Sequence, residues 1–282
     1  MICPTSKNSW LEFMKKLLPD EKNKLIKALL IAGIIIVSGA WLFYSWYYQS
    51  LPQAAIYVLN SVPTPTAGEN ILVFSPHPDD ETIAAGGYIA ASEKAGAHVW
   101  IALVTNGNKH GLEYSRYDEF IKATGALGVT PDHLFFLGYP DGGLYKVNQT
   151  SFQNNLQNII SEVNPQVIIA PDPLDYNRDH ATIGKAVAAI TSGKGKTIYY
   201  YFVHYPHFPI PQNYAPRMYV LPPLRLVSAS ENWMKFVLPP GVEDMKRTAV
   251  LEYKSQLGNP FLQSLLLGMV RKNELFVVVN HS

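Results

Sequence analysis

The feature that most constrains the fold is a regular alternation of strand-like and helix-like segments from residue 70 onward. Short runs rich in β-branched and aromatic residues predict strands at 71–75, 98–105, 133–139, 166–171 and 197–205. Apolar residues at helical spacing predict helices at 81–96, 115–128, 151–164 and 180–193. Because strands that alternate with helices build βαβ units, we expect an α/β fold with a mostly parallel sheet and helices on both faces.

Polar clusters follow the first four predicted strands, at the point where each strand ends. In chain order they read HPDD, TNGN, PDGG and PDPLDYNRDH. Since the carboxyl ends of parallel strands meet at one edge of a sheet, we expect these clusters to share that edge, where α/β folds bind their ligands. No GxGxxG follows any of these strands, so the glycines that cradle a dinucleotide phosphate are missing.

Composition limits the partners and the kinds of metal site that this chain can have. The net charge of +1 gives no overall field that would attract nucleic acid, and no nucleic-acid partner is expected. Cys3 is the only cysteine, which excludes an internal disulfide and a cysteine-rich zinc site. A metal bound by this chain would therefore need His, Asp or Glu ligands.

The N-terminal part carries an uncharged apolar run, ALLIAGIIIVSGAWLFYSWYY, at residues 28–48. At about 1.5 Å per residue this run can cross about 30 Å of hydrocarbon, so we expect one transmembrane helix. Several lysines precede it and none follows before Lys94, which predicts that residues 1–27 are cytoplasmic. A cleaved signal peptide or a buried core helix are the alternatives. The length of the run and its apolar character on every face favour a retained anchor.

After this helix, residues 49–69 are interpreted as a linker, because the stretch SVPTPTAGEN is rich in Pro, Thr and Gly. The alternating segments then form one domain, residues 70–282. The sequence thus predicts a single-pass membrane protein whose folded domain lies on the extracytoplasmic side.

The stretch SPHPDDET, residues 75–82, places several charges directly after an apolar strand. One interpretation is a helix start, with an aspartate cap and Glu81 in the first turn. That interpretation leaves His77 unexplained. His77 and Asp80 lie three residues apart on a tight turn and can face one point, and an imidazole with a carboxylate suits Zn²⁺. Catalytic zinc takes three protein ligands, and His180 is the best-placed third.

Five motifs occur in a specific order along the chain: PHPDDE, TNG, RYDEF leading into GALGV, FFLGYPDGGL and PDPLDYNRDHATIG. In this order they resemble the PIG-L (LmbE-like) family of zinc-dependent N-acetylglucosaminyl deacetylases. The resemblance covers about residues 70–260 and includes AVLEYKSQ (249–256), which is similar to that family's late helix. It implies a Rossmann-like sheet and a zinc-dependent hydrolase that removes the N-acetyl group from an N-acetylglucosamine-containing glycan or glycoconjugate.

The resemblance also implies roles for individual residues. His77, Asp80 and His180 would bind zinc, or another divalent metal, with Asp179 behind these ligands and Asp79 as the general base. Amide hydrolysis fits such a set, because zinc lowers the pKa of water and a nearby carboxylate accepts the proton. Since Asp79 and Asp80 are adjacent, one can bind metal while the other faces the water.

Two more residues are implied as contacts to the sugar, Arg116 and Asp141. By residue type alone, either could instead belong to a loop ion pair or a helix cap. An N-acetylated sugar or glycan is the expected substrate partner, and the membrane is the other expected partner, through the N-terminal helix.

One position departs from the family pattern. The family usually has His-x-x-His at the second motif, and here the first of these histidines is Asn177. The predicted metal ligands are unaffected. The acid or oxyanion donor, however, would have to be Asn177, His204 or His207. The two histidines follow the fifth strand and could reach the same edge, although their Tyr and Pro neighbours also suit ordinary packing.

The missing histidine leaves two alternatives open. The chain could be a catalytically weak, metal-dependent glycan-binding module. It could also be a zinc amidase or esterase that acts on a non-sugar acyl group. The loop at 203–223, rich in Pro and Tyr, lies where a pocket rim is expected and does not identify the substrate.

Overall fold

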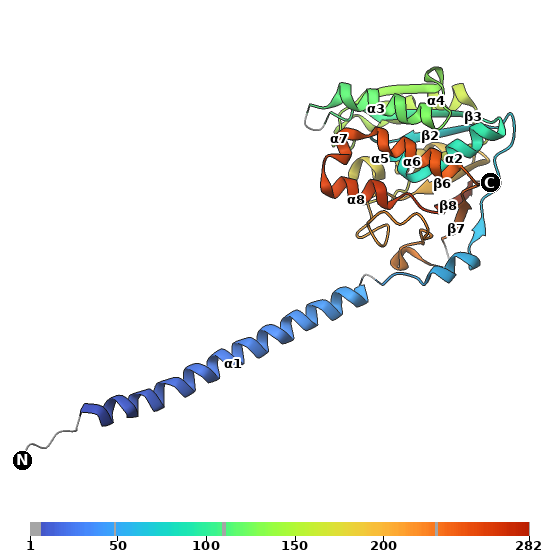
Figure 1. The fold of residues 1–282 in the computed structure, drawn as a ribbon. Helices are drawn as coiled ribbons and strands as arrows, with labels where there is room; N and C mark the ends of the chain where they lie inside the picture. The colour runs from blue at the N-terminus through green and yellow to red at the C-terminus, as the bar shows by residue number, and fades with distance from the viewer. Residues whose placement is uncertain (1–6, 48, 109–110, 229–230, 282) are drawn as a thin grey trace, which may run out of the picture. The chain divides into compact units, whose positions relative to one another are not determined.

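The computed structural model describes residues 7–47, 49–108, 111–228 and 231–281, which fall into two compact units, Met1–Gln49 and Ser50–Ser282 (Figure 1). The first unit holds one helix, α1 (Lys7–Tyr47). Its stretch from Lys22 to Tyr47 has a mean hydropathy of 2.3 and is long and apolar enough to cross a membrane. A signal sequence can have the same properties. The helix begins well before the predicted span at 28, and Tyr48 and residues 1–6 lie outside the described residues.

The second unit is built on one mixed sheet of eight strands in the order β1-β7-β8-β6-β5-β2-β3-β4. Its strands are β1 (Asn60–Ser61), β2 (Asn70–Ser75), β3 (His98–Thr105), β4 (Leu134–Tyr139), β5 (Val167–Pro171), β6 (Lys196–Tyr201), β7 (Trp233–Val237) and β8 (Asn273–His281). Only β8 pairs antiparallel, with β6 and with β7. The predicted α/β fold with a mostly parallel sheet is therefore confirmed.

Helices cover both faces of this sheet, as predicted (Figure 1). They are α2 (Asp80–Ala95), α3 (Glu113–Ala126), α4 (Gln149–Val163), α5 (Arg178–Thr191), α6 (Val242–Glu252), α7 (Lys254–Leu257) and α8 (Pro260–Gly268). Helix α6 packs on α2 and α3, and α4 packs on α5. The chain proceeds from β2 to β3 and β4 in one direction and from β5 to β6 in the other. The space beyond β2 and β5 is thus the switch point where such sheets bind ligands.

In the second unit, three predicted segments depart from the sequence prediction by more than a shift of one or two residues. The predicted linker at 49–69 contains a 3₁₀ helix, η1 (Gln53–Val58), and strand β1, which pairs with β7. The fifth predicted strand ends at Tyr201 rather than at 205, because the N–H groups of Val203 and His204 donate to the side chain of Asp175 instead of to a strand. The predicted late helix at 249–256 is interrupted at Tyr253.

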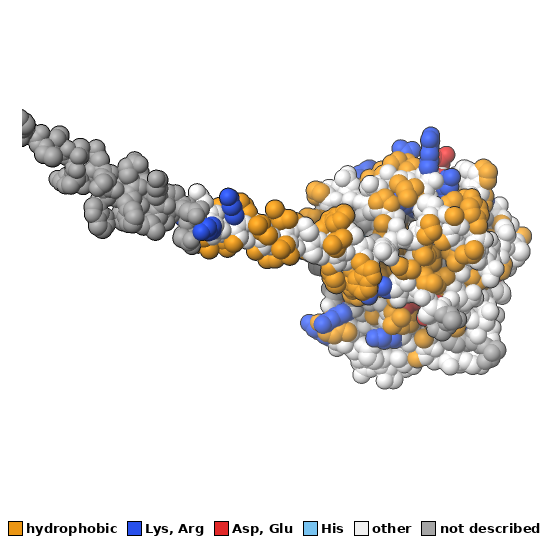
Figure 2. All heavy atoms as spheres, turned by 90° about the horizontal axis from the view of Figure 1, so that it is seen from below, with side chains coloured by type: hydrophobic (Ala, Val, Ile, Leu, Met, Phe, Trp, Pro, Cys, Tyr) orange, Lys and Arg blue, Asp and Glu red, His pale blue; other side chains and the backbone are white. Residues whose placement is uncertain are grey.

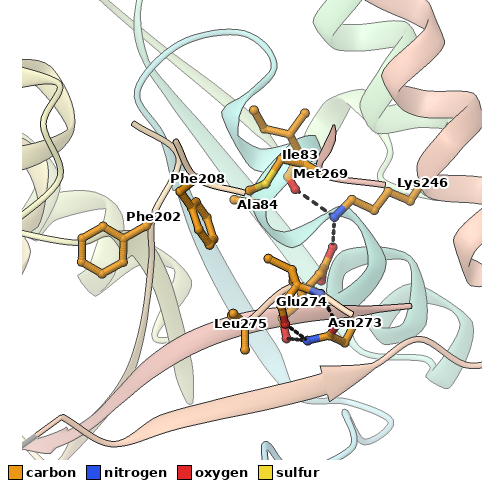
Figure 3. A pocket seen from close by; sticks show the side chains of 10 residues that line it. Ile83, Ala84, Phe202, Phe208, Lys246, Met269, Asn273, Glu274 and Leu275 are labelled. Carbon is orange, nitrogen blue, oxygen red and sulfur yellow. Dashed lines mark hydrogen bonds and ion pairs between the residues drawn. The ribbon is translucent and has the colours of Figure 1, made fainter. Parts of the chain in front are cut away.

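A buried ion pair holds the middle of α2 (Figure 3). Lys246 Nζ lies 2.6 Å from Glu274 Oε1 and donates to the carbonyl of Ile83 at 2.8 Å. Glu274 accepts from the backbone N–H groups of Gly87 and Tyr88. A Cβ on Gly87 would lie only 3.1 Å from Glu274 Oε1 and closer still to Leu238. The absence of a side chain at Gly87 therefore permits this close approach.

Candidate active site

The predicted metal ligands lie at the switch point of the sheet. His77 and Asp80 occupy the turn between β2 and α2, and His180 lies in the first turn of α5, after β5. Strands β2 and β5 are neighbours, with Ile71 opposite Val167. This pairing brings together side chains that are about a hundred residues apart in sequence.

One carboxylate oxygen stands between the two histidine rings. Asp80 Oδ2 lies 3.0 Å from His77 Nδ1 and 3.0 Å from His180 Nε2, and it also accepts from the backbone N–H of His77 at 2.9 Å. All three side chains are buried, and one ligand atom from each lies within 4.8 Å of the others. Two imidazole nitrogens and one carboxylate oxygen form a donor set that suits Zn²⁺.

A second carboxylate stands behind each histidine. His77 Nε2 lies 3.2 Å from Asp179 Oδ2, and His180 Nδ1 lies 3.5 Å from Asp175 Oδ2. Histidines that bind metal usually direct their other ring nitrogen to a carboxylate or a carbonyl, which fixes the ring and its tautomer. The sequence analysis also placed Asp179 behind the metal ligands. Asp175 had no predicted role, although it belongs to the quoted motif.

The electrostatics of these residues fit a bound cation. Among the described residues, neither nitrogen of His180 makes a hydrogen bond, although Asp80 lies close to one of them. Burial lowers the pKa of His180, but the charges of Asp80 and Asp175 outweigh it and raise the pKa to about 10. The pKa of His77 rises to about 9 because hydrogen bonds to Asp179 and Asp80 overcome its burial. The carboxylates thus draw positive charge to this point, which a divalent cation can supply.

A second group of possible ligands shares His77 and adds Asp141 and Asp179. Its carboxylates already have other partners. Asp179 accepts from the N–H groups of Gly142 and Leu144, and Asp141 faces Arg116. Because the first group offers two imidazoles and this one offers a single imidazole, the group of His77, Asp80 and His180 fits Zn²⁺ better.

Asp79 stands at the N-cap position, directly before α2, but its side chain does not cap the helix. Its side chain makes no cap hydrogen bond, and its backbone has a φ of 130°, a strained value for an aspartate. The carboxylate instead lies 3.4 Å from Arg116 and lines a cleft of about 390 Å³. Burial raises the pKa of Asp79 to about 8, against the opposite effect of Arg116. The alternative of a simple aspartate cap is therefore wrong for this residue.

Arg116 connects the turn to the rest of the cleft. Its guanidinium donates to the carbonyls of Pro78 and Gly107 and lies 3.4 Å from both Asp79 and Asp141. Arg116 and Asp141 both line the cleft. They form an ion pair, which was one of the two sequence interpretations, and the same pair borders the space available to a ligand.

The residues considered for the donor role are separated by the fold. Asn177 lines the cleft, but its Oδ1 caps α5 by accepting from the N–H of Asp179 at 2.9 Å, which leaves its amide NH₂ as the donor. His204 also lines the cleft, with its ring centroid 4.7 Å from that of His180. Burial and the charge of His180 lower the pKa of His204 to about 4. His207 is not among the residues described as lining the cleft.

The outer wall of the cleft was not predicted from the sequence. It is formed mainly by side chains that follow the late helix, together with one from the loop before α3: Leu112, Ser255, Gln256, Asn259, Phe261 and Leu262. Glu119 on α3 holds this wall, because its carboxylate accepts from both the N–H and the hydroxyl of Ser255. Ser255 and Gln256 end the stretch AVLEYKSQ, which was quoted only as a late helix, and no motif marks the other residues of this wall.

Comparisons with known proteins agree with this geometry. The family model of PIG-L, described as GlcNAc-PI de-N-acetylase, matches residues 72–191. A protein of Bacillus cereus named "Probable N-acetyl-alpha-D-glucosaminyl L-malate deacetylase 2" is 32% identical over 136 residues, which are 44% of this chain and 61% of that protein. The 1D-myo-inositol 2-acetamido-2-deoxy-alpha-D-glucopyranoside deacetylase 1 of Catenulispora acidiphila is 29% identical over 140 residues, which cover 39% and 43% of the two chains.

A solved structure extends the likeness of fold to most of the second unit. The N,N'-diacetylchitobiose deacetylase of Pyrococcus horikoshii superposes with a TM-score of 0.56 at 19% identity, covering 76% of this chain and 84% of that one. At this identity the likeness concerns the fold. The chain spans less than two thirds of the length of the two curated relatives described above.

Proposed function

We propose that this chain is a membrane-anchored, metal-dependent hydrolase that removes the N-acetyl group from an N-acetylglucosamine-containing glycan or glycoconjugate, because the PIG-L family model matches residues 72–191. The observation that carries the proposal is the convergence of His77, Asp80 and His180 beside a cleft, which His77 and Asp79 both line. The names of the relatives, which are deacetylases of N-acetylated sugars, support the same reaction.

His77, Asp80 and His180 would hold the metal, with Asp179 and Asp175 fixing the two rings from behind. When bound there, Zn²⁺ supplies a Lewis acid and lowers the pKa of water at its open position. The geometry at His180 supports this assignment. Its buried ring nitrogens face Asp80 and Asp175 at 3.0 and 3.5 Å, but among the described residues neither nitrogen makes a hydrogen bond, and a metal would give one of them a partner.

Asp79 is the proposed general base. Its carboxylate borders the cleft while Asp80, the next residue, turns inward to the histidines. Burial raises the pKa of Asp79 to about 8, and Arg116 beside it acts in the opposite direction, towards the ionised form that accepts a proton from water. Hydrolysis adds that water across the amide, so acetate leaves and the sugar nitrogen takes up a proton.

His204 is the proposed donor to the reacting amide, with the amide NH₂ of Asn177 as a second donor on the same cleft. Arg116 and Asp141 are proposed contacts to sugar hydroxyls, since a paired guanidinium and carboxylate offer both donors and acceptors.

The reaction is tested by acetate release. The purified full chain, loaded with Zn²⁺, is incubated with a panel of N-acetylated sugars and a matched panel of acyl esters. Acetate from the N-acetyl sugars, lost on chelation and restored by metal, is the expected result. Release from the esters alone would assign a different hydrolase. Metal binding and sugar binding without release from either panel would assign a binding module, the function that Asn177 in place of a histidine favours.

The same proposal includes a membrane anchor at α1, with the N-terminus in the cytoplasm. The length and hydropathy of Lys22–Tyr47 support a span, and the lysines that precede the apolar run support this orientation. A thiol reagent that cannot cross membranes should leave the single cysteine, Cys3, unlabelled in intact cells and label it after lysis. Labelling in intact cells would reverse the orientation.

A further inference from the structure

A second, apolar cavity lies away from the cleft, on the face formed by η1 and the segments 219–228 and 231–233. It measures about 260 Å³, and Leu51, Val58, Val227 and Trp233 are among its lining residues. We call this surface the η1 face and define it by Leu51, Tyr57, Val58, Leu224 and Val227. None of these residues lines the candidate active site.

Large apolar side chains are unusually exposed on the η1 face. Val58 is 81% exposed and Tyr57 is 76% exposed, while Leu224 and Val227 are more than 40% exposed. Figure 2 shows hydrophobic side chains gathered over one side of the compact unit. Contiguous apolar patches of this kind mark surfaces that bind something, because exposed hydrophobic groups carry a free-energy cost in water.

The η1 face is held in shape by hydrogen bonds, so its exposure belongs to a fixed surface. Gln53 donates to the carbonyl of Tyr219 and accepts from its N–H. Lys235 Nζ donates to the carbonyls of Ile56 and Leu59, both at 2.7 Å. The ring of Tyr57 meets that of Tyr219 at 6.3 Å between centroids.

Two observations identify the partner as a lipid bilayer. The four residue steps from Tyr47 to Leu51 can span at most about 14 Å, so an anchored α1 keeps Leu51 within reach of the headgroup region. Charge agrees with this partner. Arg217 and Arg225 are exposed and lie in or next to the segment that forms the face, while Glu231, which lines the cavity, is the only acidic residue between Pro209 and Lys235. This balance suits anionic lipid.

We propose that the η1 face is an interfacial membrane-binding surface, which inserts its apolar side chains at the boundary between headgroups and acyl chains and accepts an acyl chain in the cavity beside Val58 and Trp233. The proposal rests on the anchor proposed above. It adds that the folded domain is held against the bilayer by its own surface, in addition to the covalent connection to α1.

The test uses the full chain in vesicles, with Cys3→Ser as background and one cysteine at a time carrying an environment-sensitive fluorophore. Val58→Cys and Val227→Cys report the η1 face, and Ile35→Cys reports the anchor. Leu251→Cys is the matched control, because Leu251 is a similarly exposed apolar residue on α6. The vesicles contain phosphatidylcholine and phosphatidylglycerol, with or without a lipid that carries a quencher near the top of its acyl chain.

We expect the quencher to reduce emission at Val58 and Val227 by about twofold or more, because interfacial side chains reach about 5–10 Å into the boundary where the quencher lies. Leu251 should be unaffected. In vesicles of phosphatidylcholine alone, the quenching at Val58 should weaken while that at Ile35 persists.

The possible failures are distinguishable. Quenching at Ile35 without quenching at Val58 and Val227 would overturn the η1 face and leave the anchor in place. Absence of quenching at all positions would overturn both. If the unlabelled Val58→Cys chain instead forms disulfide-linked dimers and its label is insensitive to lipid, the face is covered by a second copy, and the membrane proposal is wrong.

Discussion

Helix α2 contacts two clusters of buried charge, one at its middle and one at its start. The clusters differ in how many of their polar atoms have a hydrogen-bond or ion-pair partner. At the middle of α2, Lys246 and Glu274 satisfy each other and the backbone groups of Ile83, Gly87 and Tyr88. At the start of α2, by contrast, several carboxylates crowd around two histidines. There, among the described residues, Arg116 is the only arginine or lysine with a described ion pair to these carboxylates.

The difference separates a structural cluster from a functional one. A buried charge is tolerated when its partners are present in the chain, as for Lys246 and Glu274. At the start of α2, neither ring nitrogen of His180 makes a hydrogen bond among the described residues, and the strained residue Asp79 lies next to an open cleft. Such an arrangement is typical of a site where a bound metal or ligand supplies the missing partners. Variants in the two clusters should therefore change different measured properties.

The largest expected effect comes from Asp79→Asn. A neutral amide cannot accept the proton of water, so kcat should fall by about 10²–10⁴-fold. Metal content should stay near that of the native chain, and the thermal unfolding midpoint should not fall, because one crowded carboxylate has been neutralised. Asp118→Asn, an exposed carboxylate on α3, serves as the control. Full activity in Asp79→Asn would assign the base to another group.

Lys246→Met should have the opposite profile. Removal of one partner leaves Glu274 buried and unpaired, so the free energy of unfolding should fall by about 3–5 kcal/mol. Chemical denaturation measures this loss. At temperatures where the variant is folded, its metal affinity should match that of the native chain. Lost metal with unchanged stability would contradict the division between the two clusters.

His204→Ala should reduce kcat by about 10²-fold if His204 is the donor to the reacting amide. His207→Ala is the matched control, since it removes a neighbouring histidine that does not line the cleft. Asn177→His should then be neutral or harmful, because it removes the cap of α5 and adds a redundant imidazole. A gain in kcat from Asn177→His, with no loss in His204→Ala, would give the role to position 177.

His180→Ala should lower metal affinity by about 10–100-fold or more, since a ligand should matter at least as much as the residues that orient it. Competition with a chromophoric chelator measures the affinity. Asp175→Asn, which leaves the ligand set intact, should have a smaller effect. Unchanged metal content in His180→Ala and in His77→Ala would show that these histidines do not form a metal site.

The smallest effect is expected for Glu119→Gln. This change weakens the two hydrogen bonds that hold Ser255, so the outer wall of the cleft should loosen and KM should rise by up to about tenfold, the size expected for one to two lost hydrogen bonds. The value of kcat should change little, because Glu119 does not line the cleft. An equal fall in kcat would show that Glu119 acts through the reacting groups.

The alternation of strands and helices was sufficient to predict β2 to β6 and the sheet edge where the site lies. These elements are local patterns of period 2 and 3.6, which a single sequence displays. Strands β7 and β8 were missed, although β8 is rich in valine, because nothing local indicates that the chain returns to pair beside β6. The outer wall of the cleft was missed for the same reason, since Gln256 and Phe261 reach it only through tertiary packing.

The strained backbone of Asp79 also could not be predicted from the sequence. Its adjacent aspartates read equally well as a helix cap, and only the positions of Arg116 and His180 show which carboxylate turns inward. Sequence motifs thus named the residues at this turn, while the direction of each side chain depended on elements far along the chain.

The pairing of β2 with β5 has a consequence for how the protein folds. Ile71 and Val167 are neighbours across nearly one hundred residues, and closing so long a loop is slow and entropically costly. The histidines on either side of that pairing meet only after the loop has closed. Zn²⁺ bound by His77, Asp80 and His180 would bind the chain in which β2 and β5 are paired in preference to the unpaired chain. It would therefore slow the separation of these two strands. Metal retention would then report the completeness of folding as well as readiness for catalysis.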